Sequence, residues 1–377
     1  MLSAEVREAI RSWMFDAALP FWAVHGLDGD NGGYVEQLTK EGRDAEVGFK
    51  RTRVAARQIY VFSHAAILGW SAGNELAAPG IDYLINRVWQ GADKGFARHL
   101  SLAGDVIDPT PDLYDHAFVL FGFAWRHKAT KDALSREWMH RTLDFIETHM
   151  RHPSGEGFWN TLPPEGWRQQ NPHMHLTEAC LAAYEATGEE RFADIARQLI
   201  ALFRARLFNA STATLGEYFT DDWSPPPGED GQIVEPGHQM EWAWILNAAR
   251  KRLGIDTAAE IRALFGFAEK HGVDPVSHVT YNSVTRPGAP LDRGSRTWPN
   301  TERMKAAVAL WELDGVDPWP VIGSSCQLLM QRYLTREPAG LWNDAFDAEG
   351  HDVSRNVPAS TLYHIFLAFA EVLRISE

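Results

Sequence analysis

The sequence predicts an all-α protein in which six helical hairpins close into a ring, the (α/α)6 barrel, with short β-hairpins or strands at one rim. Three observations predict it: a short signal repeated along the chain, an apolar helix followed by an amphipathic helix in each repeat, and an amphipathic segment near the N-terminus. Because no Ser/Gly-rich linker interrupts the pattern, we expect one domain over residues 1–377.

The repeated signal is a strand-like pair of residues that ends in an aromatic ring. The aromatic positions are separated by 62, 62, 60, 63 and 61 residues. This spacing leaves room in each repeat for a short strand, a loop and two helices of ordinary length. The six pairs are Gly33-Tyr34, Gly95-Phe96, Gly157-Phe158, Glu217-Tyr218, Thr280-Tyr281 and Leu341-Trp342.

Each repeat contains one helix that is apolar on all sides and one with a single apolar face, so the first is expected to be buried and the second to face water. The apolar helices are expected at 53–68, 112–125, 172–184, 236–249, 299–313 and 358–373, and most begin with proline. The amphipathic helices are expected at 81–89, 131–150, 191–207, 258–271 and 318–334. The sixth partner is expected from residues 4–21, which would close the ring.

The composition of the chain limits its expected binding partners and its expected location in the cell. The net charge is −14, from 36 basic and 50 acidic residues, and there is no long basic run, which excludes nucleic acid and anionic membranes as expected partners. No stretch approaches about 20 apolar residues and the N-terminus mixes both charges, so we expect a cytoplasmic protein. Cys180 and Cys326 lie in apolar helical patterns and predict neither a disulfide nor a nucleophile. The sequence leaves a homodimer open.

Polar residues recur near the start of each apolar helix, at similar distances from the repeat aromatic. Buried Arg, His and Glu are costly without partners, so six such residues in equivalent places predict a shared polar pocket at one mouth of the barrel. The six are Arg57, His116, His175, His238, Glu302 and His364.

The most informative stretch is residues 235–246, where Pro236 and Gly237 open an apolar helix. His238 and Glu241 are three residues apart and therefore share a face of its first turn. An imidazole titrates near neutral pH and a carboxylate can fix its tautomer, so the pair indicates proton transfer, with Glu241 orienting His238. The alternative is a surface capping pair.

Other candidates keep two interpretations. Arg53 and Arg57 follow Lys50 and Arg51, and the cluster is either a phosphate site or a set of ion-pair partners, with Arg57 preferred as a site residue. His116 and Glu178 either bind substrate or are core side chains with satisfied hydrogen bonds. Trp159, Trp298 and Trp342 lie where a ring can stack on a sugar, but core packing explains each as well.

A metal site is not expected. His173 and His175 are two residues apart on a helix and therefore point about 200° apart, and no third ligand follows at a zinc-like spacing.

Seven segments in order resemble the N-acylglucosamine 2-epimerase superfamily, which includes mannose isomerase, sulfoquinovose isomerase and cellobiose 2-epimerase. The resemblance covers nearly the whole chain and implies an (α/α)6 barrel that works on a reducing-end sugar through a cis-enediolate, without metal or cofactor. The segments are 32–36, 53–62, 112–118, 171–179, 236–242, 297–302 and 362–364.

The resemblance also implies roles for single residues. His364 would take the C2 proton and deliver it to C1, while His238 helps to open the sugar ring and moves protons among its oxygens. In a 2-epimerase the two imidazoles would act on opposite faces of C2. Arg57 would steady the enediolate, and the substrate-binding set would be His175, Glu302, His116, Trp298, Trp342, Asn171 and Glu178.

The segment Arg296-Thr-Trp-Pro-Asn-Thr-Glu302 resembles the mannose isomerase branch more than cellobiose epimerases, which usually carry Trp-Trp-Pro-Gln-Ala-Glu there. D-mannose/D-fructose isomerisation is therefore the predicted reaction. A 2-epimerase of the N-acylglucosamine or cellobiose type and a phosphosugar substrate held by Lys50 and Arg51 remain alternatives. More distant ones are a glycoside hydrolase, which needs two carboxylates such as Glu241 with Glu302 or Asp344, and a non-catalytic scaffold.

Overall fold

A computed structural model describes residues 3–376, which form two compact units. Unit 1 contains the described residues up to Trp22, the segment Thr39–Arg43 and the described residues from Arg204 onward. Unit 2 contains Ala23–Leu38 and Asp44–Phe203. We describe each unit by itself, and the single domain expected from the sequence stays a prediction.

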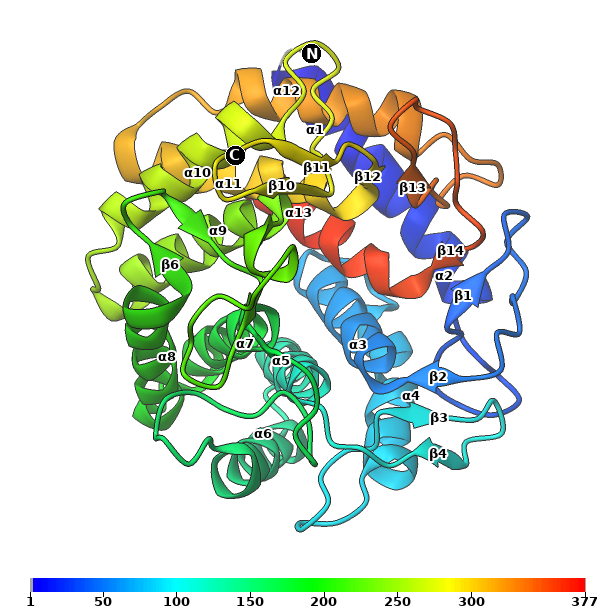
Figure 1. The fold of residues 1–377 in the computed structure, drawn as a ribbon. Helices are drawn as coiled ribbons and strands as arrows, with labels where there is room; N and C mark the ends of the chain where they lie inside the picture. Colours follow the sequence, from blue (N-terminus) through cyan, green and yellow to red (C-terminus); the bar gives the residue numbers. More distant parts are fainter. Residues whose placement is uncertain (1–2, 377) are drawn as a thin grey trace. The chain divides into compact units, whose positions relative to one another are not determined.

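Unit 2 contains three helical hairpins (Figure 1). The inner helices are α3 (Thr52–Ile67), α5 (Leu113–Thr130) and α7 (Gln170–Thr187), and α5 packs against both of the others. The outer helices are α4 (Gly73–Tyr83), α6 (Ala133–Phe145) and α8 (Glu190–Leu202). Each outer helix continues into a five-residue π-helical turn, at Leu84–Val88, Ile146–Met150 and Phe203–Leu207. The first outer helix begins at Gly73, earlier than the expected residue 81. The sequence pattern missed this start because proline is unusual inside a helix and Pro79 lies inside α4.

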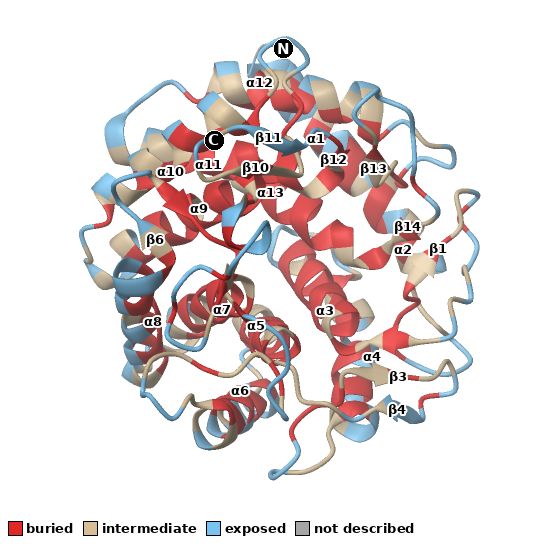
Figure 2. Ribbon diagram, viewed as in Figure 1, coloured by how far each residue is buried: buried red, intermediate tan, exposed pale blue. Residues whose placement is uncertain are grey.

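In unit 1, the inner helices are α9 (Pro236–Leu253), α11 (Thr297–Asp314) and α13 (Leu362–Arg374), and α11 packs against both of the others. The outer helices are α10 (Ala258–Gly272) and α12 (Trp319–Leu328), the latter followed by a π-helical turn at Leu329–Tyr333. In both units the inner helices are buried over most of their length, whereas the outer helices expose one face (Figure 2).

The N-terminal segment forms α1 (Ser3–Ser12), a π-helical turn (Trp13–Ala18) and α2 (Leu19–His25). Helix α1 packs against α12 and α13, and the Trp13 ring meets Phe369 of α13 edge to face at 5.7 Å. This confirms the prediction that the N-terminal segment supplies the outer partner of the sixth hairpin.

Short strands and turns connect the helices. Unit 2 has an antiparallel sheet of β2 (Lys50–Arg51), β3 (His99–Leu100) and β4 (Val106–Asp108). In unit 1, β10 (Ser283–Thr285) lies between β9 (Ile233–Val234) and β11 (Pro290–Asp292), β12 (Ser295–Arg296) pairs with β13 (Ala345–Phe346), and β6 (Phe208–Asn209) pairs with β7 (Thr214–Leu215). The other elements are β1 (Gln37–Leu38), β5 (Arg168–Gln169), β8 (Tyr218–Phe219), β14 (Val357–Pro358) and two 3₁₀ turns, Asp230–Gln232 and Ala359–Thr361. Strands β2, β5, β9, β12 and β14 each come directly before an inner helix or its first turn and so fix where that helix begins.

The repeat has a backbone signature: an antiparallel bridge that follows an outer helix. Its second residue is Tyr34, Phe96 and Phe158 in the first three repeats, as the sequence pattern predicts. In the fourth and fifth repeats it is Leu215 and Thr280, not the aromatic residues Tyr218 and Tyr281. The aromatic pattern was slightly out of register there, because the bridge is formed by the backbone and does not require an aromatic side chain.

Within residues 3–376, no helix combines the length and the apolar character needed to cross a membrane. The cytoplasmic location stays a prediction.

Candidate active site

Most of the polar candidates share one register on the inner helices. They stand six residues after the residue that caps the N-terminus of the helix, and all are buried. Helix α5 carries Phe118 in this register, so only five of the six inner helices contribute a polar group. The five are Arg57, His175, Glu241 and Glu302, counted from the caps Arg51, Gln169, Glu235 and Arg296, and His364, counted from Pro358 before the 3₁₀ turn of α13.

A second register, four residues after the cap, has a structural role. The side chain there accepts a hydrogen bond from the backbone N–H of the bridge residue in the same repeat, and so ties the helix to the preceding loop. The donor and acceptor pairs are Phe96 N and His116 Nε2 (3.0 Å), Phe158 N and His173 Nε2 (3.0 Å), Leu215 N and Gln239 Oε1 (3.2 Å), and Thr280 N and Asn300 Oδ1 (2.9 Å).

Of the two interpretations of His116, a core side chain with satisfied hydrogen bonds fits these contacts better, and substrate binding stays a prediction. His116 Nε2 accepts from Phe96, while its Nδ1 donates to the carbonyl oxygen of Asp112 at 2.7 Å. Burial lowers the pKa of His116 to about 4, so the ring is neutral. Gly95 is required beside it, because a Cβ there would lie 2.5 Å from His116 Nε2.

His238, at the first turn of α9, lies among carboxylates. Its Nδ1 is 2.9 Å from Glu217 Oε2 and 3.6 Å from Glu235 Oε2. Burial alone would lower the pKa of His238, but the charges of Glu217 and Glu235 and the hydrogen bond to Glu217 outweigh it and raise the pKa to about 9. The ring is an imidazolium at neutral pH.

The residue that orients His238 is Glu217, not Glu241 as the sequence predicted. Glu217 lies 21 residues before His238, in the loop that leads to α9, so helical spacing does not reveal it. The one signal in the sequence was its place beside Tyr218, inside the repeated pair of the fourth repeat.

His364, in α13, is held by a buried group of charges. Its Nδ1 lies 2.8 Å from Glu302 Oε1, while the other oxygen of Glu302 lies 2.7 Å from Lys305 Nζ. The carboxylate of Glu241 lies 3.8 Å from Lys305 Nζ and 4.0 Å from His364 Nδ1. Glu241, Glu302 and Lys305 are fully buried, and the sequence analysis had not singled out Lys305.

Trp298, at the start of α11, connects the two histidines. The centroid of its half-buried indole ring lies 5.0 Å from the His238 ring and 5.3 Å from the His364 ring. Gly237 permits this approach, because a Cβ there would lie 2.6 Å from the indole. Two imidazoles, each with Nδ1 close to a carboxylate, therefore both contact one indole ring within unit 1.

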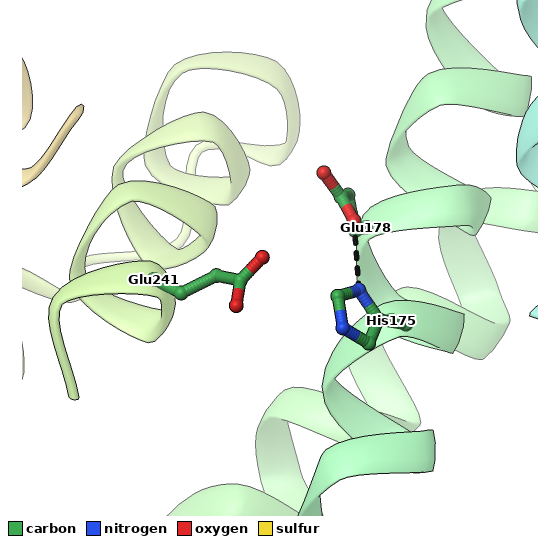
Figure 3. Close-up of side chains that lie close together, drawn as sticks. All are labelled: His175, Glu178 and Glu241. Carbon is green, nitrogen blue, oxygen red and sulfur yellow. Dashed lines mark hydrogen bonds and ion pairs between the residues drawn. The ribbon is translucent and has the colours of Figure 1, made fainter. Parts of the chain in front are cut away.

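In unit 2, Arg57, His175 and Glu178 lie in a second cluster around Tyr114. Arg57 donates to the Tyr114 hydroxyl at 2.6 Å and lies over the Phe118 ring at 4.1 Å. His175 Nδ1 lies 3.1 Å from Glu178 Oε2, and Figure 3 shows this pair on α7, with the Glu241 side chain of α9 drawn in the same view. The His175 ring meets Tyr114 edge to face at 5.0 Å. Tyr114 is a functional candidate that the sequence analysis did not single out.

Asn171 and Tyr114 line a cavity of about 320 Å³ in unit 2. The side-chain oxygen of Asn171 is buried and makes no hydrogen bond among the described residues, so it is able to accept a hydrogen bond from a bound ligand.

The other two tryptophans differ in exposure. Trp342 is fully buried and stacks on Trp22 at 5.2 Å with an interplanar angle of 20°, so it belongs to the core and presents no face to a sugar. Trp159 is half-buried, with its ring 4.2 Å from the His152 ring.

Three basic residues of the first repeat, Lys50, Arg51 and Arg53, each form an ion pair with a carboxylate. Lys50 Nζ lies 2.5 Å from Asp28 Oδ2 and 2.9 Å from the Gly32 carbonyl oxygen, and Arg51 pairs with Glu36. Arg53 bonds to Asp115 at 2.6 Å and lies 3.3 Å from Asp112. Of the two interpretations of this cluster, ion pairing is the one that the structure shows for Lys50, Arg51 and Arg53, whereas Arg57 donates to the Tyr114 hydroxyl.

Two groups in unit 1 have metal-like ligand spacing. The first group consists of Glu217, Glu235 and His238, and the second of Glu241, Glu302 and His364. Within each group the possible ligand atoms lie within 4.8 Å of one another. Each group already has an internal cation, the His238 imidazolium in the first and the Lys305 ammonium in the second. In each group this internal cation offsets one of the two carboxylate charges, so the donor set fits a proton-transfer site without an added metal ion.

Comparison with known proteins gives the family. The model of the N-acylglucosamine 2-epimerase family matches residues 32–368. A protein of Rhizobium meliloti (strain 1021) named mannose-6-phosphate isomerase is 36% identical over 96% of this chain and 95% of its own length. A cellobiose 2-epimerase of Bacteroides fragilis is 24% identical over 88% of each chain.

Among solved structures, a D-mannose isomerase is similar with a TM-score of 0.87 at 22% identity, over 99% of this chain and 98% of that one. This similarity confirms the predicted (α/α)6 barrel fold class. The protein is thus an enzyme that isomerises or epimerises a sugar, and it belongs to the N-acylglucosamine 2-epimerase family.

Proposed function

We propose that the protein is a metal-independent aldose–ketose isomerase that interconverts D-mannose and D-fructose through a cis-enediolate. The observation that carries the proposal is the meeting of His238 and His364 at the indole of Trp298. Flat aromatic rings suit the apolar face of a sugar, and a proton transfer next to a carbonyl needs one base and one acid within reach of adjacent atoms.

His364 has the features of the base. Glu302 accepts a hydrogen bond from Nδ1, which fixes the neutral tautomer with its proton on Nδ1 and makes Nε2 the basic nitrogen. This nitrogen would remove the proton from C2 of the open-chain aldose while O1 is protonated by His238, and would then deliver a proton to C1. His238 would take back the O2 proton as the ketose carbonyl forms, so that both imidazoles regain their starting protonation states. One imidazole suffices for both steps if the enediolate stays bound with the same face of C1 and C2 turned towards His364 Nε2.

His238 has the features of the acid. Since its pKa is raised to about 9, it is protonated at neutral pH and can donate a proton to the sugar oxygen on which negative charge develops. The same proton would assist opening of the cyclic sugar. Glu217 holds Nδ1, so the proton given to the sugar is the one on Nε2. The roles predicted for Arg57, His175, Asn171 and Glu178 stay predictions.

We propose an unphosphorylated substrate, although one relative is named mannose-6-phosphate isomerase. A phosphate would need uncommitted positive charge. Lys50, Arg51 and Arg53 are each paired with a carboxylate, and the guanidinium of Arg296, beside Trp298, lies 3.4 Å from Glu235. A neutral polyol does not compete with these ion pairs.

Epimerisation at C2 is the second candidate, and the similarity to a cellobiose 2-epimerase favours it. Two imidazoles at one indole suit this reaction if one removes the C2 proton and the other returns it from the opposite face. A hydrolase has less support, because Glu241 and Glu302 share one ammonium and are not separated acid and base groups.

The test is proton NMR of turnover in deuterated water with mannose, fructose, N-acetylmannosamine, cellobiose and mannose 6-phosphate. The proposal predicts conversion of mannose to fructose, with solvent deuterium at C1 in the fraction of turnovers in which the proton on His364 exchanges with solvent before it is transferred. It also predicts a kcat/KM for mannose at least tenfold above that for mannose 6-phosphate. Glucose formed directly from mannose without fructose would indicate a 2-epimerase. Preference for the phosphate ester would contradict the proposed substrate, and inert sugars throughout would contradict the reaction.

A further inference from the structure

Lys305 is a lysine without solvent access in the middle of α11. Its side chain is fully buried, and Nζ lies 2.7 Å from Glu302 Oε2 and 3.8 Å from Glu241 Oε1. The ammonium also lies over the Trp244 ring, 4.3 Å from its centroid. A buried ammonium is costly unless it is paired, so its environment is built for it.

Glu302 connects this lysine to the proposed base. One carboxylate oxygen lies 2.8 Å from His364 Nδ1 and the other 2.7 Å from Lys305 Nζ. Lys305 stands three residues after Glu302 on α11, a spacing that places both side chains on one helix face. Lysine, carboxylate and imidazole therefore form a continuous chain of contacts.

Glu241 adds a second buried negative charge from α9. Its carboxylate is fully buried and makes no hydrogen bond within residues 3–376, so the Lys305 ammonium at 3.8 Å is important for its charge balance. With Lys305 present, one ammonium offsets one of the two carboxylates beside His364. Without it the same space holds two negative charges.

We propose that Lys305 is the positioning residue of His364: a built-in cation that keeps Glu302 ionised as the acceptor of the His364 Nδ1 proton. The inference deepens the proposed function, because it rests on the role of His364 as the base. Lys305 acts through Glu302 and is not a catalytic residue itself.

The consequence follows from charge balance. If the ammonium is removed, the cluster binds an additional proton, on His364 or on one of the two carboxylates. A proton on His364 occupies Nε2, and a proton on Glu302 can be donated to Nδ1 and reverse the tautomer. In both cases the basic Nε2 form appears only at higher pH.

Among the described residues, the charged and titratable neighbours of His364 include Glu302 and Lys305 from α11, Glu241 from α9 and the adjacent Tyr363. The His238 imidazolium lies at the same Trp298 indole ring and is unchanged in the variants of Lys305. Helix α1 also packs against α13, but its charged residues are exposed and lie on its other face. The pH dependence of His364 is therefore expected to report on Lys305 above all.

The experiment uses Lys305→Met, which keeps the aliphatic length and removes the charge. The protonation of His364 is followed without sugar by NMR of histidine-labelled protein, with His364→Gln to assign the signal. The kcat/KM for mannose is measured over the same pH range. Lys251→Met is the matched control, because Lys251 makes an equally short ion pair, 2.6 Å to Glu312, on the exposed end of α9.

We expect the His364 titration and the acidic limb of kcat/KM to move together to higher pH in Lys305→Met, by about one pH unit or more. Activity near neutral pH should fall at least tenfold and recover as the pH rises, with KM changed little. Lys251→Met should match the wild type. An unchanged His364 titration, or an activity loss that is equal at every pH, would overturn the proposal.

Two further measurements guard against a folding defect. Lys305→Ala is titrated with ethylamine and propylamine, which should restore the wild-type pH profile, whereas neutral alcohols of the same length should not. Lys305→Arg should retain the wild-type titration of His364. Absence of rescue in folded Lys305→Ala counts against the proposal. If the His364 titration shifts in Lys305→Met but no sugar is converted by the wild type, the proposed function is contradicted and the coupling between Lys305 and His364 is supported. If the wild type converts sugar but the His364 titration does not shift in Lys305→Met, the proposed function is supported and the role of Lys305 is contradicted.

Discussion

The first turn of α5 and the first turn of α9 both contain a buried histidine, yet one ring is neutral and the other is positively charged. His116 is bonded to a backbone amide and a backbone carbonyl, and its pKa is lowered to about 4. His238 is bonded to Glu217 and lies near Glu235, and its pKa is raised to about 9. The first ring is a fixed neutral hydrogen-bonding group and the second is an acid. Both rings are buried, so the difference in pKa comes from the groups to which each ring is hydrogen-bonded.

The difference corresponds to one residue of helix register. His116 stands four residues after its cap and His238 three. In α9 the structural position is filled by Gln239, which leaves the imidazole beside it for chemistry. A similar division of roles occurs within α7 over two residues of register, where His173 is the structural ring and His175 is the ring paired with Glu178.

The largest expected effect comes from replacing the two proposed chemical rings. His364→Gln and His238→Gln should each lower kcat/KM by about 10³-fold, since each removes a proton-transfer group. His116→Gln is the matched control and should keep nearly full activity, because Gln239 already performs the structural task in α9. Equal losses in all three variants would remove the distinction between the two registers.

Stability should depend on pH with opposite signs at the two rings. His238 is held above its ordinary pKa of 6.5, so its stabilisation is fully present below that pH and is lost as the pH rises through about 9. The difference in unfolding free energy between wild type and His238→Gln should change by up to about 3 kcal/mol over this range. For His116 the folded pKa is depressed, so stability is lost as the pH falls from 6.5 towards about 4. Denaturant unfolding at a series of pH values measures both trends.

His116→Ala should destabilise the protein by about 2 kcal/mol without changing the kcat/KM of the folded fraction. The substitution leaves the buried N–H of Phe96 without its acceptor and opens a cavity. The midpoint of chemical denaturation measures this, and His116→Gln should recover most of the loss. A large change in KM would instead indicate contact with substrate.

The smallest effect is expected from Glu217→Gln. The amide still bonds to His238 but contributes no charge, so the pKa of His238 should fall from about 9 towards its ordinary value. The alkaline limb of kcat/KM should move to lower pH, with a loss of about tenfold at pH 8. An alkaline limb that stays in place would mean that Glu217 is not the source of the raised pKa.

The sequence predicted the inner helices well, because helices that are apolar on all sides have a strong signal. It also predicted the pairing of the N-terminal segment with the last hairpin. It was less accurate for α4, where Pro79 interrupts the helical pattern, and for the fourth and fifth repeat positions, where Leu215 and Thr280 replace the expected aromatic residues.

The site was harder to predict, for physical reasons. Offsets counted from an aromatic ring could not separate His116 from His238, because the decisive quantity is the distance from the helix cap. Glu217 reaches His238 through the path of a loop, which spacing does not encode. Lys305 was missed because a lysine among apolar residues suggests a surface position, and only its two buried carboxylate neighbours explain it.

The pairing of α1 with α13 has a consequence for how the chain can be rewired. Ser3 and Ala4 line the same surface pocket as Ile375 and Ser376, so the first and last described residues are neighbours. A short linker across them, with a new opening in an exposed loop such as Val276–Ser277, should yield a circular permutant that folds as the parent does. A permutant that folds would show that the order in which the hairpins pack, and not the position of the chain ends, specifies this architecture.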